Sequence, residues 1–322
     1  MAHIYVYSPS SAIRDKAAFR RGLARLKALG HDVELDISAT VHHMRFAGDD
    51  ASRVAAVGRA AASGADVALI TRGGYGLTRI LPDLPYDAIH AAVAGGMRFV
   101  GLSDFTAMQC AMLAVRGTGS WAGPALGEDF GAQIEADGSP DLVMEACFDD
   151  LLTGLGEGAG WRLPLRRQVT PENIAINQDL IRGWSDFHPI SGVLWGGNLT
   201  VLCALMGTPW MPSIEGGILF LEDVGEHPYR IERMLLQLLH AGVLGRQKAV
   251  VMGQFNRFKL VPGYDRGFRL ETVFDFLRSK VSVPVLEGLP FGHVPTKVVL
   301  PVGREVSLSV QGREALLFWG DD

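Results

Sequence analysis

Residues 98–106 read Arg98-Phe99-Val100-Gly101-Leu102-Ser103-Asp104-Phe105-Thr106. The apolar run up to Leu102 predicts a short strand, and the apolar spacing over 105–116, ended by a glycine, predicts a helix. Ser103 therefore lies on a tight turn whose following helix supplies unpaired N–H groups and the positive end of its dipole. Ser103 becomes a candidate nucleophile, and Asp104 a candidate donor of a backbone N–H to an oxyanion. Helix capping by either side chain is the competing interpretation.

Strand and helix patterns alternate on both sides of this turn throughout the first half of the chain. The expected strands are 4–8, 33–35, 67–71 and 98–102, and the expected helices are 15–29, 50–64, 86–94 and 105–116. Such alternation favours an α/β fold with a mostly parallel sheet.

The second half is less regular and follows a glycine-rich, weakly periodic region. We interpret residues 156–185 as a linker between an N-terminal domain, 1–155, and a C-terminal domain, 186–322. The C-terminal domain is expected to contain strands 216–221, 248–254 and 285–287, helices 228–241 and 272–280, and a terminal hairpin of 305–310 with 314–318.

Composition limits the class of protein. The 322 residues are 48% apolar with a net charge of −5, which allows a large core and argues against a nucleic-acid partner. The first residues enter a strand without the pattern of a signal peptide, and no apolar run is long enough to span a bilayer, so we expect a cytoplasmic protein without a membrane partner. Three widely spaced cysteines argue against a disulfide framework or a zinc site.

A glycine-rich turn follows the third expected strand, as Arg72-Gly73-Gly74-Tyr75-Gly76. Glycines at the end of a strand let the backbone approach a ligand, so an N–H group of this turn, at Gly73 or Gly74, could complete an oxyanion hole. A phosphate-binding loop is weakly supported, because no Lys-Ser/Thr pair follows and the dinucleotide spacing does not fit. A purely structural turn remains an alternative.

Two further segments offer the partners that a serine nucleophile needs. Glu222 and Asp223 follow the expected strand 216–221, where strand alternation would point them to opposite faces, and Glu226 lies nearby. The pattern leaves open which acid acts, and either Asp223 or Glu226 could cap the next helix. His293 lies in a loop shaped by glycine and proline and could take a proton near neutral pH.

The order of serine, acid and histidine along the chain is that of α/β-hydrolase triads, although position 105 is Phe where the full hydrolase turn has glycine. His42 and His43 are adjacent, and the side chains of neighbouring residues on an extended segment point to opposite faces. We therefore do not expect them to bind one metal ion together.

Taken together, seven segments in order resemble the LD-carboxypeptidase family, which includes murein tetrapeptide carboxypeptidases and microcin C immunity peptidases. They are Ser8-Pro9-Ser10-Ser11, Phe46-Ala47-Gly48-Asp49 with Arg53, Arg72-Gly73-Gly74-Tyr75-Gly76, Gly101-Leu102-Ser103-Asp104-Phe105-Thr106, Gly196-Gly197-Asn198-Leu199, Leu221-Glu222-Asp223 and Gly292-His293. One departure is Trp121-Ala122-Gly123-Pro124, where relatives often have His-Gly-Pro.

The resemblance implies Ser103 as nucleophile, His293 as general base and acid, and Glu222 as the orienting carboxylate. It implies an N-terminal Rossmann-like domain, a C-terminal domain with a β-rich part, and a homodimer. The expected reaction releases terminal D-alanine from an L-centre, diaminopimelate or lysine, in a murein tetrapeptide. No metal or organic cofactor is needed. The terminal carboxylate requires a cation, for which Arg72, Arg79 and Arg230 are available, although a structural or surface role is the favoured interpretation of each.

Two other functions remain open on sequence grounds. An immunity peptidase would use the same three residues to cleave an aminoacyl or peptidyl nucleotide amide, with a tryptophan as platform for the base. Trp121, Trp184, Trp195 and Trp210 are available. A non-catalytic protein that binds a sugar or nucleotide would explain the glycine turn, but not the serine, glutamate and histidine segments.

Overall fold

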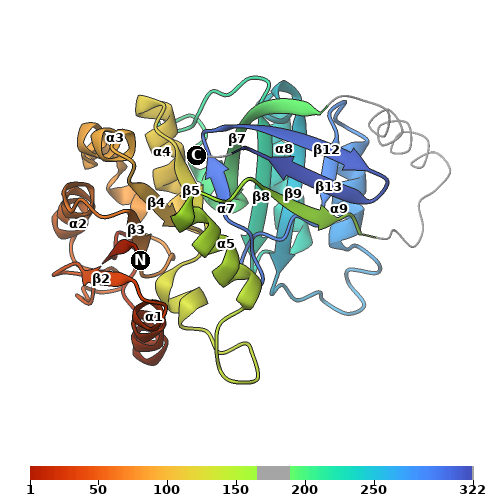
Figure 1. Ribbon diagram of the computed structural model, residues 1–322. Coiled ribbons are helices and arrows are strands. Elements are labelled where there is room, and N and C mark those ends of the chain that lie inside the picture. Colours follow the sequence, from red (N-terminus) through yellow and green to blue (C-terminus); the bar gives the residue numbers. More distant parts are fainter. Residues whose placement is uncertain (165–188, 321–322) are drawn as a thin grey trace.

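The computed structural model describes residues 1–164 and 189–320. Most of the expected linker, 165–185, and Trp184 therefore lie outside the described residues. Figure 1 shows the elements of the first half gathered around one sheet, with those of the second half around another beside it.

The first sheet has six strands in the order β11-β5-β4-β3-β1-β2. Its strands are β1 His3–Tyr7, β2 Asp32–Leu35, β3 Val67–Ile70, β4 Arg98–Gly101, β5 Ser120–Ala122 and β11 Leu300–Val302. Its helices are α1 Lys16–Ala28, α2 Asp50–Ala62, α3 Tyr86–Ala94 and α4 Phe105–Arg116. All neighbouring strands are parallel except β11, which pairs antiparallel with β5. The carboxyl ends of β3 and β4 therefore lie at the same edge of the sheet, where the glycine turn and Ser103 follow.

The second sheet has seven strands in the order β10-β9-β8-β7-β12-β13-β6. Its strands are β6 Gly158–Arg162, β7 Ile190–Asn198, β8 Ile218–Val224, β9 Ala249–Asn256, β10 Val285–Glu287, β12 Glu305–Gln311 and β13 Glu314–Phe318. The remaining helices are α5 Leu142–Thr153, α7 Leu199–Ala204, α8 Pro228–His240 and α9 Leu270–Arg278. Strands β7 to β10 pair in parallel, and β12, β13 and β6 add an antiparallel part. The predicted α/β class, with a parallel N-terminal sheet and a β-rich C-terminal part, is confirmed.

Strand β7 is an element that the sequence pattern does not predict. It contains Gly192, Gly196 and Gly197, which lower the local β propensity and hide the strand. Tertiary contacts explain two of these glycines. A Cβ on Gly196 would lie 2.0 Å from the Phe220 carbonyl oxygen, and one on Gly197 would lie 2.4 Å from Thr106 Oγ1.

The close approach at Gly197 joins the two halves of the molecule. Thr106 is in the first turn of α4, and its Oγ1 accepts a hydrogen bond of 3.0 Å from the Asn198 N–H at the end of β7. Around this contact one continuous core includes Phe105 and Met108 from α4 and Trp195 from β7. The turn that precedes α4 is thereby held in place against the second sheet.

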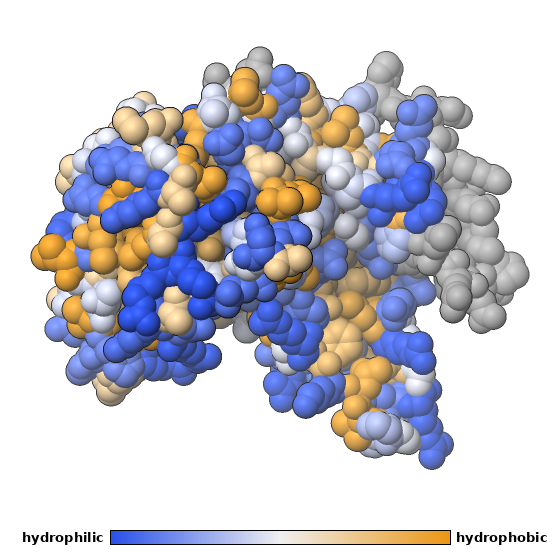
Figure 2. Space-filling model, turned by 60° about the horizontal axis from the view of Figure 1, so that its bottom comes forward, coloured by the Kyte–Doolittle hydropathy of each residue, from blue (hydrophilic) through white to orange (hydrophobic). Residues whose placement is uncertain are grey.

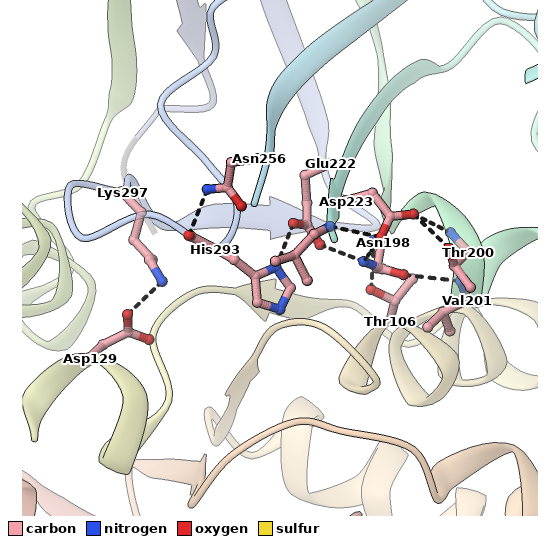
Figure 3. Close-up of polar contacts among 11 residues, drawn as sticks. Thr106, Asp129, Asn198, Thr200, Val201, Glu222, Asp223, Asn256, His293 and Lys297 are labelled. Carbon is pink, nitrogen blue, oxygen red and sulfur yellow. Dashed lines mark hydrogen bonds and ion pairs between the residues drawn. The ribbon is translucent and has the colours of Figure 1, made fainter. Parts of the chain in front are cut away.

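A buried ion pair makes a second junction. Lys297 Nζ, from the loop before β11, lies 2.5 Å from Asp129 Oδ1 in the π-helical turn η3, Leu126–Phe130. The two side chains are only 2% and 4% exposed (Figure 3). Removing one member of such a pair leaves an uncompensated charge in a low dielectric, which is strongly destabilising.

Two further expectations from the sequence concern the cysteines and segments that could span a membrane. The three cysteines are all free thiols. In the part of the chain that the structure describes, no helix is both long and apolar enough to cross a membrane.

The ion pair gives a test of stability. We expect Lys297→Met to lower the free energy of unfolding by about 3 kcal/mol or more, and Lys297→Met/Asp129→Asn to recover much of that loss, because the double variant leaves no buried charge. Urea denaturation measures both, with the exposed Lys27→Met as the matched control. A single variant as stable as the wild type would show that the pair contributes nothing.

Candidate active site

Ser103 occupies the turn between β4 and α4 in a strained backbone conformation. Its φ is 65°, in the left-handed region, which costs a residue other than glycine about 1–3 kcal/mol and persists only where the surroundings enforce it. Those surroundings include two glycines. A Cβ on Gly101 would lie 2.7 Å from Ile70 Cδ1, and one on Gly73 would lie 2.6 Å from Ser103 Cβ and 2.9 Å from its Oγ. The glycine turn after β3 thus packs directly against the Ser103 side chain.

Asp104 does not cap α4 with its side chain. Its Oδ2 instead accepts hydrogen bonds from Ser10 Oγ at 2.7 Å and from the Leu77 N–H at 2.8 Å. Burial raises the pKa of Asp104 to about 6, and these two donors oppose that rise. The side chain thereby ties the loop after β1 and the chain beyond the glycine turn to the turn at Ser103.

Gly74 takes a conformation that only glycine fits. Its φ is 88°, and an added Cβ would lie 2.3 Å from Ser11 Oγ. That hydroxyl donates to the Gly73 carbonyl at 2.7 Å and accepts from Arg72. Among the described residues, the N–H groups of Asp104 and Gly74 donate to no other group of the protein. Both backbone donors expected for an oxyanion are therefore unpaired beside Ser103.

His293 and Glu222 lie 71 residues apart in the sequence and are hydrogen-bonded in the structure. The His293 Nδ1 to Glu222 Oε2 distance is 2.8 Å, with Glu222 fully buried and the histidine side chain 13% exposed. Because a carboxylate only accepts, Nδ1 must donate, and in the neutral ring Nε2 is then an acceptor. Figure 3 shows Nε2 directed away from Glu222.

The pKa of His293 results from opposing effects. Burial lowers it, but the hydrogen bond and charge of Glu222, with the charge of Glu128, outweigh burial and raise the pKa above 6.5, against a smaller opposing effect of Lys297. The Asn256 side chain donates to the His293 carbonyl at 2.8 Å and holds the loop. The ring is thus oriented and tuned to exchange a proton near neutral pH.

Glu222 lies within β8 rather than after it, because the strand runs to Val224. The register of β8 on β9 shifts between Leu221 and Asp223. Strand alternation would separate Glu222 from Asp223, yet Asn198 Nδ2 donates to both, at 3.0 Å to Glu222 Oε1 and 3.1 Å to Asp223 Oδ1. The irregular register accounts for this departure from alternation, since it brings neighbouring side chains toward one partner.

The three candidate acids have different partners. Asp223 Oδ2 accepts from the N–H and hydroxyl of Thr200 at the start of α7, at 2.9 and 2.7 Å. Glu226 pairs with Arg230 at 3.4 Å. Neither caps α8, whose N-cap is His227. Burial raises the pKa of Asp223, with the charge of Glu222 adding to the rise. Of the three, Glu222 is the acid in contact with the histidine.

A cavity of about 400 Å³ opens beside His293 between the two halves of the chain. Its lining includes Leu102, which precedes Ser103, together with residues from α1, η3 and the loops after β9 and around His293. Among the described residues no hydrogen bond joins Ser103 to His293, which is common for catalytic pairs without substrate. Hydrophilic side chains predominate on the face of the molecule shown in Figure 2, with apolar patches between them.

Three residues of this region had no assigned role in the sequence analysis. Asn198 lies in a quoted segment, but its contact with two carboxylates follows from strand pairing. Lys297 and Arg257 line the cavity from loops without a periodic pattern. In the sequence all three look like ordinary polar residues, so no local signal distinguishes them.

The pair of His293 and Glu222 yields a direct physical test. We expect Glu222→Gln to lower the pKa of His293, because the carboxylate is what outweighs burial. An NMR titration of the histidine ring in both proteins measures the change, and Glu226→Gln, which alters the acid paired with Arg230, is the control. An unchanged pKa in Glu222→Gln would contradict the electrostatic role of this carboxylate.

The chain is similar to known proteins over most of its length. Residues 4–123 match the model of the LD-carboxypeptidase N-terminal domain, and 191–308 match that of the LD-carboxypeptidase C-terminal domain. The crystal structure of muramoyltetrapeptide carboxypeptidase from Oxalobacter formigenes has a TM-score of 0.83 and 36% identity, covering 99% of each chain.

Two curated relatives show the range of names in this group. The murein tetrapeptide carboxypeptidase of Pseudomonas aeruginosa is 28% identical over 248 residues, which cover 74% of this chain and 70% of that protein. The microcin C7 self-immunity protein MccF of Escherichia coli is 29% identical over 254 residues, which cover 76% and 71%.

The two family models match most of the chain and include the turn at Ser103, Asn198 and Glu222. The chain belongs to the LD-carboxypeptidase family and is a serine carboxypeptidase hydrolase.

Proposed function

We propose that this protein removes the terminal D-alanine from murein tetrapeptides, cutting after an L-centre of diaminopimelate or lysine, through Ser103, His293 and Glu222. The observation that supports this most is the 2.8 Å hydrogen bond between His293 and the fully buried Glu222, which equips an imidazole as a base. The strained turn at Ser103 offers the hydroxyl. The relative from Oxalobacter formigenes is named a muramoyltetrapeptide carboxypeptidase, which supports the substrate class.

The steps follow from the roles of the three groups. Ser103 Oγ attacks the carbonyl carbon of the penultimate residue while His293 Nε2 takes the hydroxyl proton. Glu222 accepts from Nδ1 and stabilises the imidazolium that forms. The N–H groups of Asp104 and Gly74 bind the oxyanion, and one such donor is typically worth about 10²–10³ in rate.

Completion of the reaction needs no other reagent than water. His293 returns the proton to the amine of the leaving D-alanine, which departs and leaves an acyl-enzyme on Ser103. Water, deprotonated by His293, then attacks the ester carbonyl and releases the shortened peptide and the free hydroxyl. The protein's own side chains supply every proton transfer, so the proposed mechanism uses no metal or organic cofactor.

The biological setting is part of the same proposal. A protein that trims tetrapeptides to tripeptides fits peptidoglycan recycling in the cytoplasm. Assembly as a homodimer is our expectation from the family resemblance, and sedimentation of the purified protein measures it.

A second candidate function comes from the similarity to MccF. The same three residues would then cleave an aminoacyl or peptidyl nucleotide amide, and the pocket would need an aromatic platform for the base. Trp195 is 1% exposed and donates its Nε1–H to Gln247, so it is not available to stack on a ligand. Trp121 packs edge-on against Trp319. Trp210 packs against the core, and Trp184 lies outside the described residues, so the choice between the two substrates falls to the assay.

The decisive assay is mass spectrometry of L-Ala–D-Glu–diaminopimelate–D-Ala incubated with the protein. We expect the wild type to release one alanine and Ser103→Ala to release none, because the variant lacks the nucleophile. Ser213→Ala, at an exposed serine, is the matched control and should act like the wild type. Activity on an aminoacyl sulfamoyl adenosine in place of the tetrapeptide would favour the second candidate. Equal turnover by Ser103→Ala would make that serine structural.

The pH profile tests the base. His293 must be neutral to accept a proton and its pKa is raised above 6.5, so kcat/KM should fall as the pH drops through a value above 6.5. In Glu222→Gln the midpoint of the fall in kcat/KM should move to lower pH. The plateau value of kcat/KM should drop by about 10²–10⁴-fold, since the His293 ring loses the carboxylate that orients it. A limb that stays in place in this variant would exclude His293 as the group that titrates.

A further inference from the structure

The sequence suggested Arg72, Arg79 and Arg230 as cations for a terminal carboxylate, and the structure engages each of them elsewhere. Arg79 pairs with Asp50 at 2.7 Å, and Arg230 pairs with Glu226. Arg72 contacts Ser11 and pairs with Glu128 at 3.1 Å. The cations that line the cavity beside His293 are instead Arg21, Arg257 and Lys297.

The four carboxylates of this cavity all have donors within the protein, but only two of them are paired with a cation. Four carboxylates line it, and each has a partner: Asp15 accepts from the Ala17 and Ala18 N–H groups, Glu128 pairs with Arg72, Asp129 pairs with Lys297, and Asp141 accepts from the Met144 N–H and the Thr296 hydroxyl. Lys297 is thereby neutralised as well. Among the described lining residues, Arg21 and Arg257 are the cations that form no ion pair with a carboxylate.

Arg257 is the less engaged of the two. Among the described residues no hydrogen bond or ion pair holds its guanidinium, and the residue is exposed. Arg21 donates through Nε to the Gly131 carbonyl at 2.9 Å, which leaves its terminal nitrogens without a partner in the described part of the chain. These unengaged guanidinium nitrogens can donate to an anionic group of a ligand, and the planar fork of each group matches a carboxylate.

The backbone at Arg257 adds a second, independent observation. Its φ is 57°, a left-handed conformation that glycine adopts at no cost and a long side chain adopts under strain. The preceding residue, Asn256, ends β9 and donates its side-chain N–H to the His293 carbonyl at 2.8 Å. Arg257 therefore follows directly the residue that is hydrogen-bonded to the loop of His293, the proposed base. The left-handed backbone at Arg257 thus places a charged side chain beside that loop, at a position where glycine would carry no strain.

We propose that Arg257, with Arg21, which lines the same cavity from α1, binds the terminal carboxylate of the residue that the enzyme releases. This inference rests on the proposed carboxypeptidase function and names the group that makes the enzyme act at chain ends. In a peptide the terminal carboxylate is one residue beyond the scissile carbonyl, so the group that recognises it must lie close to His293. Arg257 satisfies this requirement.

The test compares two substrates that differ in one group, a tetrapeptide with a free terminal carboxylate and the same peptide as its terminal amide. We expect the wild type to prefer the free acid. Arg257→Gly relieves the strained backbone and removes the charge. The value of kcat/KM for the free acid should therefore fall about 10- to 100-fold, mainly through a higher KM. The value of kcat/KM for the amide should change little. Arg257→Lys should recover part of the preference.

Controls separate the possible failures. Lys259→Ala removes an exposed cation of the same loop and should keep the wild-type preference. If the wild type is active and Arg257→Gly keeps the full preference for the acid, the inference about Arg257 is wrong and the proposed function stands. If the folded wild type cleaves neither peptide, the proposed function itself fails.

A third peptide locates the carboxylate that Arg257 binds. Replacing the D-glutamate of the substrate by D-glutamine, in a peptide with lysine in place of diaminopimelate, removes both free carboxylates from the acyl side and keeps the terminal carboxylate. We expect Arg257→Gly to lose as much on this peptide as on the parent tetrapeptide. A loss that disappears with the D-glutamine peptide would assign Arg257 to the acyl side and overturn the inference.

Discussion

The buried amide of Asn198 is the contact on which the arrangement of the site depends. Its backbone N–H donates to Thr106 in the first turn of α4, and its Nδ2 donates to Glu222 and Asp223. Its Oδ1 accepts from the Val201 N–H and caps α7. One residue, 5% exposed, thus uses its backbone N–H and its side-chain amide to join the helix after Ser103 to the carboxylate that orients His293. Because each of these groups is buried, losing a partner would leave a polar atom unpaired, which keeps the junction rigid.

Two adjacent buried carboxylates would repel each other unless each had its own donors. Glu222 is satisfied by Asn198 and His293, and Asp223 by Asn198, Thr200 and the Val224 N–H. Glu222 is therefore in place for the proposed chemistry, whereas Asp223 holds the start of α7. This arrangement also explains how Glu222 can raise the pKa of a histidine that burial alone would lower. The strength of that effect depends on the absence of water around Glu222, which is fully buried.

In the cavity beside His293, as around Asn198, most charged side chains have partners within the protein. Its acids accept hydrogen bonds from helix N-termini, hydroxyls and cations of the protein, whereas among the described residues the guanidinium of Arg257 has no such partner. Residues of the first half, such as Arg21 and Leu102, and of the second half, such as Arg257 and His293, share its lining. The junctions at Asn198 and at Lys297 hold these halves together, and so they determine the shape of the cavity as well as the proposed catalytic groups.

The sequence by itself determined the features that depend on neighbours along the chain. Alternating strand and helix patterns identified the α/β class, and the turn at Ser103 followed from an apolar run, a glycine and a helix start. The family resemblance added the pairing of Glu222 with His293, which local pattern left open among three acids. Only the tertiary structure decided the rest: the glycine-rich strand β7, the register shift at Glu222, the role of Asn198 and the position of Arg257, whose guanidinium has no partner in the described part of the chain. Propensity, capping and dipoles act over a few residues, whereas contacts such as the one between positions 222 and 293 arise when two sheets pack and share a core.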